Sequence, residues 1–179
     1  IGLATAEYPM DITQNNDVFV EVSGLLKALA VNLMKIANDL RLMNSGPKGG
    51  LGEIRLEPLQ LGSTIMPGKI NPVVPEMVMQ VAMKVIANDT AITMAAAHGE
   101  FELNAFMPLI ADSLLENLEL LIAATELFRT KCISSLQPNI ERCRELLELS
   151  YAFATAYTPE LGYDKVTEII DESSGDTQL

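Results

Sequence analysis

The residues best suited to chemistry in this 179-residue chain lie in one short stretch, Gly62 to Asn71, which reads GSTIMPGKIN. The stretch combines the hydroxyls of Ser63 and Thr64 with the ammonium of Lys69. Backbone N–H groups of a glycine-containing loop, a lysine and the N-terminus of a following helix can converge on an anion such as a carboxylate. The stretch is therefore a candidate anion-binding loop, and the alternative is an ordinary helix-to-helix connection that carries a surface lysine.

Two common nucleotide-binding loops are excluded. A Walker-type phosphate loop has four residues between its first glycine and the Gly-Lys pair, and then Ser or Thr. Here five residues intervene and Ile70 follows Lys69. The second glycine cluster, residues 46–52, follows no predicted strand, so it lacks the context of a dinucleotide-binding turn.

Other polar residues give weaker signals. Glu76 lies one turn into the helix expected after the loop, where a carboxylate also favours the helix dipole. His98 is the single histidine, so the chain cannot build a site from several histidines, and we interpret it as a helix-end residue. Cys132 and Cys143 lack the paired spacing of zinc ligands, so we expect reduced thiols, no metal and no other cofactor.

Composition predicts an all-α fold and narrows the classes of partner. Hydrophobic residues make up 49% of the chain and aromatic residues only 5%, a mixture that favours helices over strands. The net charge of −12 argues against a nucleic-acid or anionic-lipid surface. No apolar run is long enough to cross a bilayer and no signal peptide is recognisable, so we expect a cytoplasmic protein with no membrane partner. Because the chain begins with Ile, we expect a fragment or a trimmed terminus.

Periodicity predicts three long helices. The first runs from Asp17 to about Met43 and is apolar on several sides, which requires cover from other parts of the molecule or from other subunits. The second runs to about residue 97, with Pro72 in its first turn and Asn71 as its N-cap. The third is opened or kinked by Pro108.

Shorter elements follow. Residues 44–71 are expected to form a loop, with a short extended piece in residues 53–61. Shorter helices are predicted after Pro138 and after Thr158. We predict a partial central helical-bundle domain over 1–131, which contains loop 62–71, and a small C-terminal helical domain over 132–179 whose last residues fray.

The stretch GSTIMPGKINPVVPE resembles the signature G-S-x-x-M-x-x-K-x-N of the aspartase/fumarase superfamily. KIANDLRLMNSGPKGGLGEIRLEP upstream and GEFELNAF downstream are also similar to segments of this family. Its members are lyases that remove a Cβ proton from a succinyl-type substrate, expel a group from Cα and release fumarate. NPVVPE and NDTAITMAAAHGEFELN are more similar to aspartate ammonia-lyases than to class II fumarases, which usually carry Thr-Gln-Cys before the matching Glu.

The resemblance implies roles for individual residues. Ser63 matches the catalytic base, and Thr64 replaces a second Ser that is common in the loop. Lys69 and Asn71 match positions that bind the carboxylate of a small dicarboxylate substrate. Glu76 matches a supporting Glu that pairs with a His from another region of the family chain.

The family builds each site from three separated regions in a homotetramer, and only the third region is present here. We therefore expect the full-length protein to be an aspartate ammonia-lyase and this chain alone to be inactive. Two alternatives stay open: a class II fumarate hydratase acting on malate, and a non-catalytic helical oligomerisation fragment.

Overall fold

The computed structural model describes residues 2, 4–60, 62 and 65–173. The described chain is mostly helical, which confirms the predicted all-α fold with long packed helices. It divides into two compact units, the first made of Ile1–Leu42 and Leu56–Leu136 and the second of Met43–Arg55 and Gln137–Leu179. The domain boundary near Cys132 stays a prediction. Over the described residues, no helix is both long and apolar enough to cross a membrane.

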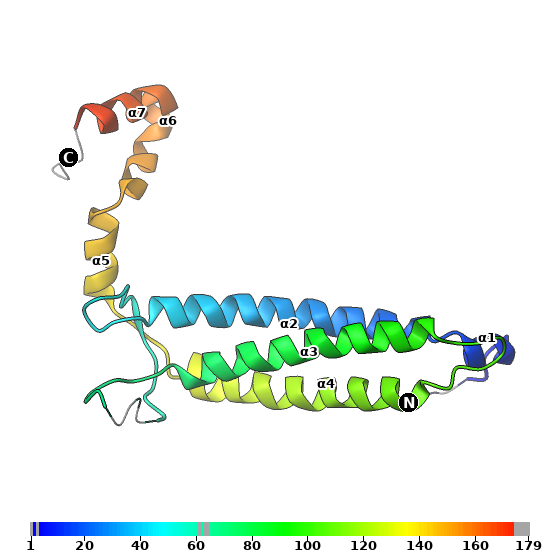
Figure 1. Ribbon diagram of the computed structural model, residues 1–179. Coiled ribbons are helices and arrows are strands. Elements are labelled where there is room, and N and C mark those ends of the chain that lie inside the picture. The colour runs from blue at the N-terminus through cyan, green and yellow to red at the C-terminus, as the bar shows by residue number, and fades with distance from the viewer. Residues whose placement is uncertain (1, 3, 61, 63–64, 174–179) are drawn as a thin grey trace. The chain divides into compact units, whose positions relative to one another are not determined.

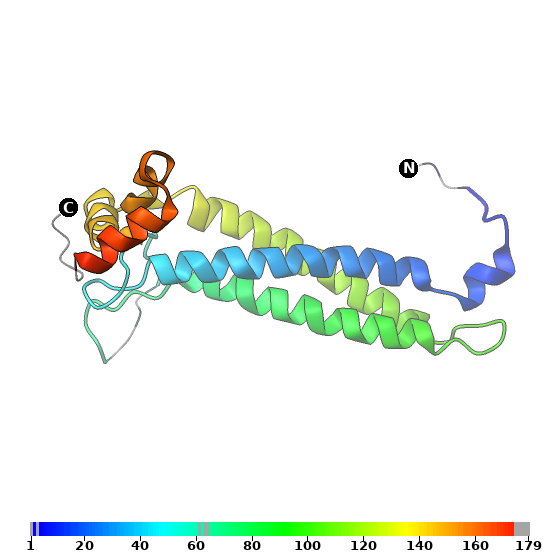
Figure 2. The same cartoon turned by 90° about the horizontal axis from the view of Figure 1, so that it is seen from above.

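Three long helices form the first unit. Figures 1 and 2 both show them side by side. In chain order the helical elements are α1 (Pro9–Gln14), α2 (Asp17–Met43), α3 (Val73–Ala97), α4 (Met107–Phe128) and a π-helical turn, η1 (Arg129–Ile133). The observed bounds of α2 equal the predicted ones, and Pro108 lies in the first turn of α4 as expected.

Two apolar clusters of described residues lie between the helices in the core of this unit. Near the middle, Ala30 of α2 packs with Ala82 and Val85 of α3 and with Leu121 of α4. The second cluster is built from Ile92, Ala95 and Ile110, with Phe19, Val20, Ala96 and Leu114 packed against it. Because both clusters draw on all three helices, burial of apolar surface holds the three together.

One face of α2 carries exposed apolar side chains in a regular stripe. The spacing of four, three, four and seven residues is that of a coiled-coil seam, with the exposed Asn32 at the position the pattern skips. We call this stripe the α2 seam; its members, with exposed fractions from 40% to 68%, are Val18, Val22, Leu25, Leu29 and Ile36. These exposed residues form one of the apolar sides that the sequence predicted for this helix.

The second unit is small and contains shorter elements. These are β1 (Ile54–Arg55), β2 (Gln137–Pro138), α5 (Ile140–Glu148), the 3₁₀ helix η2 (Tyr151–Tyr157), α6 (Thr158–Leu161) and α7 (Tyr163–Glu172). The two strands pair antiparallel, so the short extended piece predicted within residues 53–61 is present as β1. The prediction of a single helix after Thr158 is wrong, because Gly162, with a φ of 81°, separates α6 from α7.

Candidate functional site

The loop that carries the candidate chemistry connects the first strand to α3. Ser63 and Thr64 lie outside the described residues, so their assignments as base and as substrate-binding hydroxyl stay predictions. The described part of the site therefore consists of Gly62 and residues 65–71.

Two hydrogen bonds join the ends of this loop. The backbone N–H of Gly62 donates to the carbonyl of Lys69 at 2.8 Å. The side-chain Nδ2 of Asn71 donates to the carbonyl of Gly62 at 3.2 Å. We call Gly62, Lys69 and Asn71 the loop base. The two ends of the loop therefore lie next to each other.

The tip of the loop is a tight turn. The N–H of Lys69 donates to the carbonyl of Met66 at 3.3 Å, with Pro67 and Gly68 at the two central positions. The φ of Gly68 is 78°, so proline followed by a left-handed glycine gives the pattern of a type II β-turn. Ile65, on the same loop, is 87% exposed. The loop therefore presents apolar surface beside its polar groups.

The start of α3 differs from the prediction. Asn71 is not the N-cap: Pro72 precedes the first helical residue, Val73, and no side-chain cap is made. The amide of Asn71 binds Gly62 instead, and its carbonyl accepts from the N–H of Val73 at 2.9 Å. Helix capping is a local preference, and here a partner nine residues earlier in the chain takes the side chain.

Lys69 and Glu76 carry the two charges among the described candidate residues. Lys69 is exposed and Glu76 is half-buried in the first turn of α3. Over the described residues, no hydrogen bond or ion pair joins either charge to another predicted site residue. The structure brings together the backbone of Lys69 with Gly62 and Asn71, and it leaves the ammonium and the carboxylate unengaged with the loop base.

The remaining sequence candidates are structural. His98 follows the last residue of α3, which confirms it as a helix-end residue; its Nδ1 lies 2.6 Å from the carbonyl of Met94. Its ring meets that of Phe106 edge to face, with centroids 5.6 Å apart. Within the part of the chain that the structure describes, no group of three metal-ligating side chains is found.

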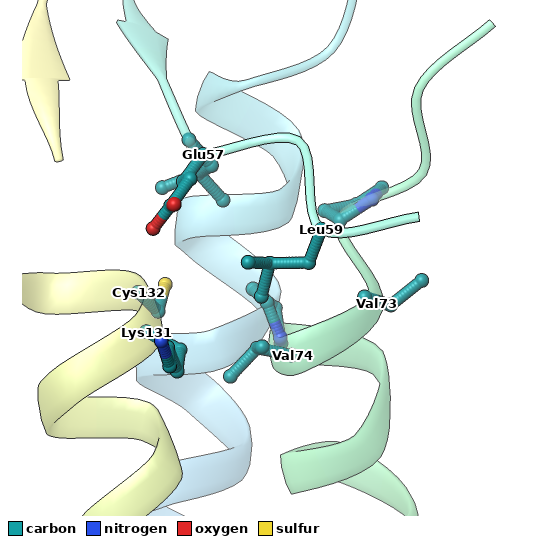
Figure 3. A pocket seen from close by; sticks show the side chains of 9 residues that line it. Glu57, Leu59, Val73, Val74, Lys131 and Cys132 are labelled. Atoms are coloured by element: carbon teal, nitrogen blue, oxygen red, sulfur yellow. The ribbon is translucent and has the colours of Figure 1, made fainter. Parts of the chain in front are cut away.

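A shallow pocket lies beside the first turn of α3. Figure 3 shows Glu57 and Leu59 over Val73 and Val74, next to Lys131 and Cys132 of η1. Its cavity volume of about 10 Å³ is far below the 300 Å³ or so of ordinary ligand sites, so this pocket is not by itself a substrate site. Burial raises the pKa of the Cys132 thiol, which makes it a poor nucleophile.

Comparisons with known proteins support the family resemblance that the loop sequence carries. A family model described as a lyase matches residues 1–87. An aspartate ammonia-lyase of Pseudomonas aeruginosa is 49% identical over 160 residues, which are 89% of this chain and 34% of that protein. The chain belongs to the aspartase/fumarase superfamily. A second superfamily member of the same organism, named fumarate hydratase class II 2, is 50% identical over 159 residues, 89% of this chain and 35% of that protein.

A solved structure with a related sequence has the same fold as this chain. The fumarate lyase:delta crystallin from Brucella melitensis in native form matches with a TM-score of 0.89 and 46% identity, over 99% of this chain and 40% of that chain. The chain thus spans about a third of the length of the curated superfamily members it matches. Identities of 49% and 50% are equal in practice, so similarity does not separate ammonia release from water release.

Sequence reasoning missed two features, one in the loop and one farther along α3. One is the close backbone approach at Gly62, where a Cβ would lie 2.2 Å from the Lys69 carbonyl oxygen, so that glycine is required there. The buried carboxylate of Asp89, held by Ser23 and Lys27, was also missed. A charged residue within the apolar pattern of α3 was the available signal.

Proposed function

We propose that the full-length protein is an aspartate ammonia-lyase, which converts L-aspartate to fumarate and ammonia. The observation that carries the proposal is the loop from Gly62 to Asn71, whose residues match the superfamily signature and whose ends meet at the loop base. The segments NPVVPE and NDTAITMAAAHGEFELN support the aspartase assignment within the superfamily.

Ser63 is the proposed base. A serine hydroxyl is too weakly acidic to ionise at neutral pH without help, so its alkoxide requires nearby positive potential and exclusion of water. The ammonium of Lys69 and the loop N–H groups are the proposed sources of that potential. The alkoxide takes a proton from Cβ of the substrate, and the electron pair of the broken C–H bond spreads onto the adjacent carboxylate.

Lys69 and Asn71 are the proposed donors to that carboxylate. It gains a second negative charge as the proton leaves, and donors accelerate the reaction only when they bind this dianion better than the ground state. The pair then forms the Cα–Cβ double bond while the C–N bond breaks and ammonia leaves with the bonding electrons. Thr64 supplies a second hydroxyl, and Glu76 supports the site through a partner outside this chain.

A homotetramer is proposed to complete the site. The α2 seam supports assembly, since a coiled-coil spacing of exposed apolar residues fits a helix of a second copy, and Asn32 within it would help fix the register. The free cysteines Cys132 and Cys143 support a reducing, cytoplasmic location.

A class II fumarate hydratase is the second candidate, because the 50% identity to the fumarate hydratase named above is as high as the identity to the aspartate ammonia-lyase. The chemistry at Ser63 would be the same, with water as the leaving group. A non-catalytic oligomerisation fragment is the third, and the presence together of Ser63, Lys69, Asn71 and Glu76 weighs against it.

The test is absorbance in the fumarate band when full-length protein receives L-aspartate or L-malate separately. Turnover of aspartate only is expected; turnover of malate only would identify the hydratase, and turnover of neither would support the non-catalytic reading. Ser63→Ala is expected to lower kcat by about 10²–10⁴-fold, while the matched variant Thr64→Ser retains most activity. Near-normal turnover in Ser63→Ala would overturn the assignment of the base.

A further inference from the structure

We infer that Asn71 is a positioning residue that holds the loop base closed, in addition to any contact with substrate; the activity arm of its test rests on the proposed function. The bond from Asn71 Nδ2 to the Gly62 carbonyl joins residues nine positions apart. The Gly62 N–H binds the Lys69 carbonyl at the same place. Both polar groups of the Gly62 backbone are therefore used to fix where the loop begins and ends.

The base is tight, so it depends on the residue at position 62. A Cβ there would lie 2.2 Å from the carbonyl oxygen and 2.6 Å from the carbonyl carbon of Lys69, and 2.9 Å from the N atom of Ile70. All three are backbone atoms, which cannot rotate away as a side chain can. Any side chain at position 62 must therefore open the contact with Lys69, without changing a single group of Asn71.

The donor inventory of Asn71 permits two tasks at once. An asparagine amide has two N–H donors on Nδ2 and an acceptor oxygen, and the Gly62 carbonyl uses one donor. The second N–H stays in the amide plane that this bond orients. Asn71 is half-buried, so that N–H is not sealed from a ligand.

Holding the base also places Lys69. Its carbonyl is bound to Gly62 and its N–H to Met66, so the backbone is held on both sides while the side chain is exposed. Preorganised donors cost no rearrangement when charge develops on a substrate. Opening the base would therefore lower kcat even in a variant that keeps every donor.

Limited proteolysis tests this without reference to activity. Trypsin cleaves after lysine, and Lys69 lies within the loop that the base holds, so mass spectrometry can follow cleavage of the Lys69–Ile70 bond in the full-length protein. Asn71→Ala, Asn71→Asp and Gly62→Ala are each expected to speed this cleavage by about 3- to 10-fold, the equivalent of one neutral hydrogen bond. Asn71→Asp is informative because it keeps the size of the side chain and removes both donors.

Two controls separate opening of the base from loss of the fold. Gln80→Ala, on the exposed part of α3 outside the loop base, is expected to leave cleavage after Lys69 unchanged. Cleavage after Lys48, in the other compact unit, is the reference in the same digest and should not change. A parallel rise after both lysines would indicate general unfolding and overturn the inference, as would equal rates after Lys69 in wild type and variants.

The activity arm distinguishes the two proposals. Gly62→Ala is expected to lower kcat although it removes no donor, and Asn71→Ala, which also loses the proposed donor to the substrate, is expected to lower kcat at least as much. Normal kcat in Gly62→Ala would reduce Asn71 to a contact residue and overturn positioning. Faster cleavage in a protein with no lyase activity would instead overturn the proposed function and leave the loop base standing.

Discussion

The Oδ1 atom of Asp89 on α3 lies 2.8 Å from the Oγ atom of Ser23 on α2, and Ser23 is fully buried. The other carboxylate oxygen of Asp89 lies 2.6 Å from the ammonium of Lys27, one turn along α2. The carboxylate is thus held by a hydroxyl and a cation from the same facing helix. Shifting α2 along α3 would break both contacts at once, so the pair specifies how these two helices align.

Removal of Lys27 should cost more stability than neutralisation of Asp89. The Asp89 side chain is 7% exposed and that of Lys27 46% exposed. Lys27→Met leaves a buried charge without its partner, so we expect a loss of about 2–4 kcal/mol in the free energy of unfolding. Asp89→Asn keeps an acceptor for Ser23 and frees Lys27 to turn to water, so about 1 kcal/mol is expected.

Urea unfolding measures both losses. Lys35→Met is the matched control, because the Lys35 side chain is 74% exposed and its ion pair with Asp39 is on the surface. Its effect should stay within about 0.5 kcal/mol. Equal losses for Lys27→Met and Lys35→Met would show that the buried pair holds nothing that the surface pair does not.

Titration of Cys132 should make stability fall at alkaline pH. The thiol is 1% exposed, and burial raises its pKa above the ordinary 9.0. Above pH 9 the unfolded chain therefore loses this proton before the folded chain does, so the stability associated with the thiol is complete below pH 9 and is lost as pH rises toward the folded pKa. The melting-temperature gap between wild type and Cys132→Ala should narrow from pH 8 to pH 11.

Ile110→Val is the control for this measurement, because it shortens a buried side chain that does not titrate. Its gap from wild type should be constant over the same range. Alkylation gives a second check: in the native protein, iodoacetamide should modify the half-buried Cys143 well before Cys132. A gap for Cys132→Ala that stays constant with pH would contradict the effect of burial.

Sequence pattern predicts the long helices well because their information is local. The apolar period from Asp17 to Met43 gives α2 with its observed bounds, and Pro108 marks the start of α4. The N-cap role of Asn71 was predicted wrongly because the partner of its side chain, Gly62, is reached only when the loop closes on itself. The partners of Asp89, Ser23 and Lys27, are 66 and 62 residues away, distances over which no periodicity carries information.

The same distinction between local and non-local information applies to the candidate site. Residue types and spacing suffice to find the loop and to exclude a Walker-type site, since both depend on consecutive residues. The contacts of the loop base depend on backbone geometry that spacing does not specify. The two-residue ladder of β1 and β2 likewise pairs Ile54 with Pro138, far apart in the chain, so only the short extended piece could be predicted.

The start of α5 should control the stability of the second unit. Asn139 Nδ2 donates to the Gly52 carbonyl at 2.9 Å, and its backbone N–H donates to the carbonyl of Glu53 at 2.8 Å. Arg142 Nε donates to the Leu51 carbonyl at 2.9 Å. Three consecutive carbonyls are thus bound by residues at one end of one helix, which ties segment 43–55 to α5.

Asn139→Ala removes a helix cap and the bond to Gly52, so we expect a loss of about 1–2 kcal/mol and faster hydrogen exchange in α5. Arg142→Ala should lose about 0.5–1.5 kcal/mol by releasing Leu51. The exposed Arg144 is the matched control, and Arg144→Ala should leave exchange in α5 unchanged. Exchange that responds equally to Arg142→Ala and Arg144→Ala would show that charge on α5, and not the contact with the loop, is responsible.

Charge placed in the α2 seam should weaken the proposed tetramer. Leu25, 68% exposed, lies in the middle of the seam. If a second copy covers it, Leu25→Arg buries an unpaired cation against apolar partners, so we expect association at least about tenfold weaker, equivalent to 1.4 kcal/mol. Analytical ultracentrifugation of the full-length protein measures the shift toward smaller species.

Val31→Arg is the matched control: Val31 is 49% exposed on α2 but lies outside the seam, so its effect should be smaller. Tetramers that persist unchanged in Leu25→Arg at micromolar concentration would place the subunit contact elsewhere, since no neighbouring helix could then pack along this stripe.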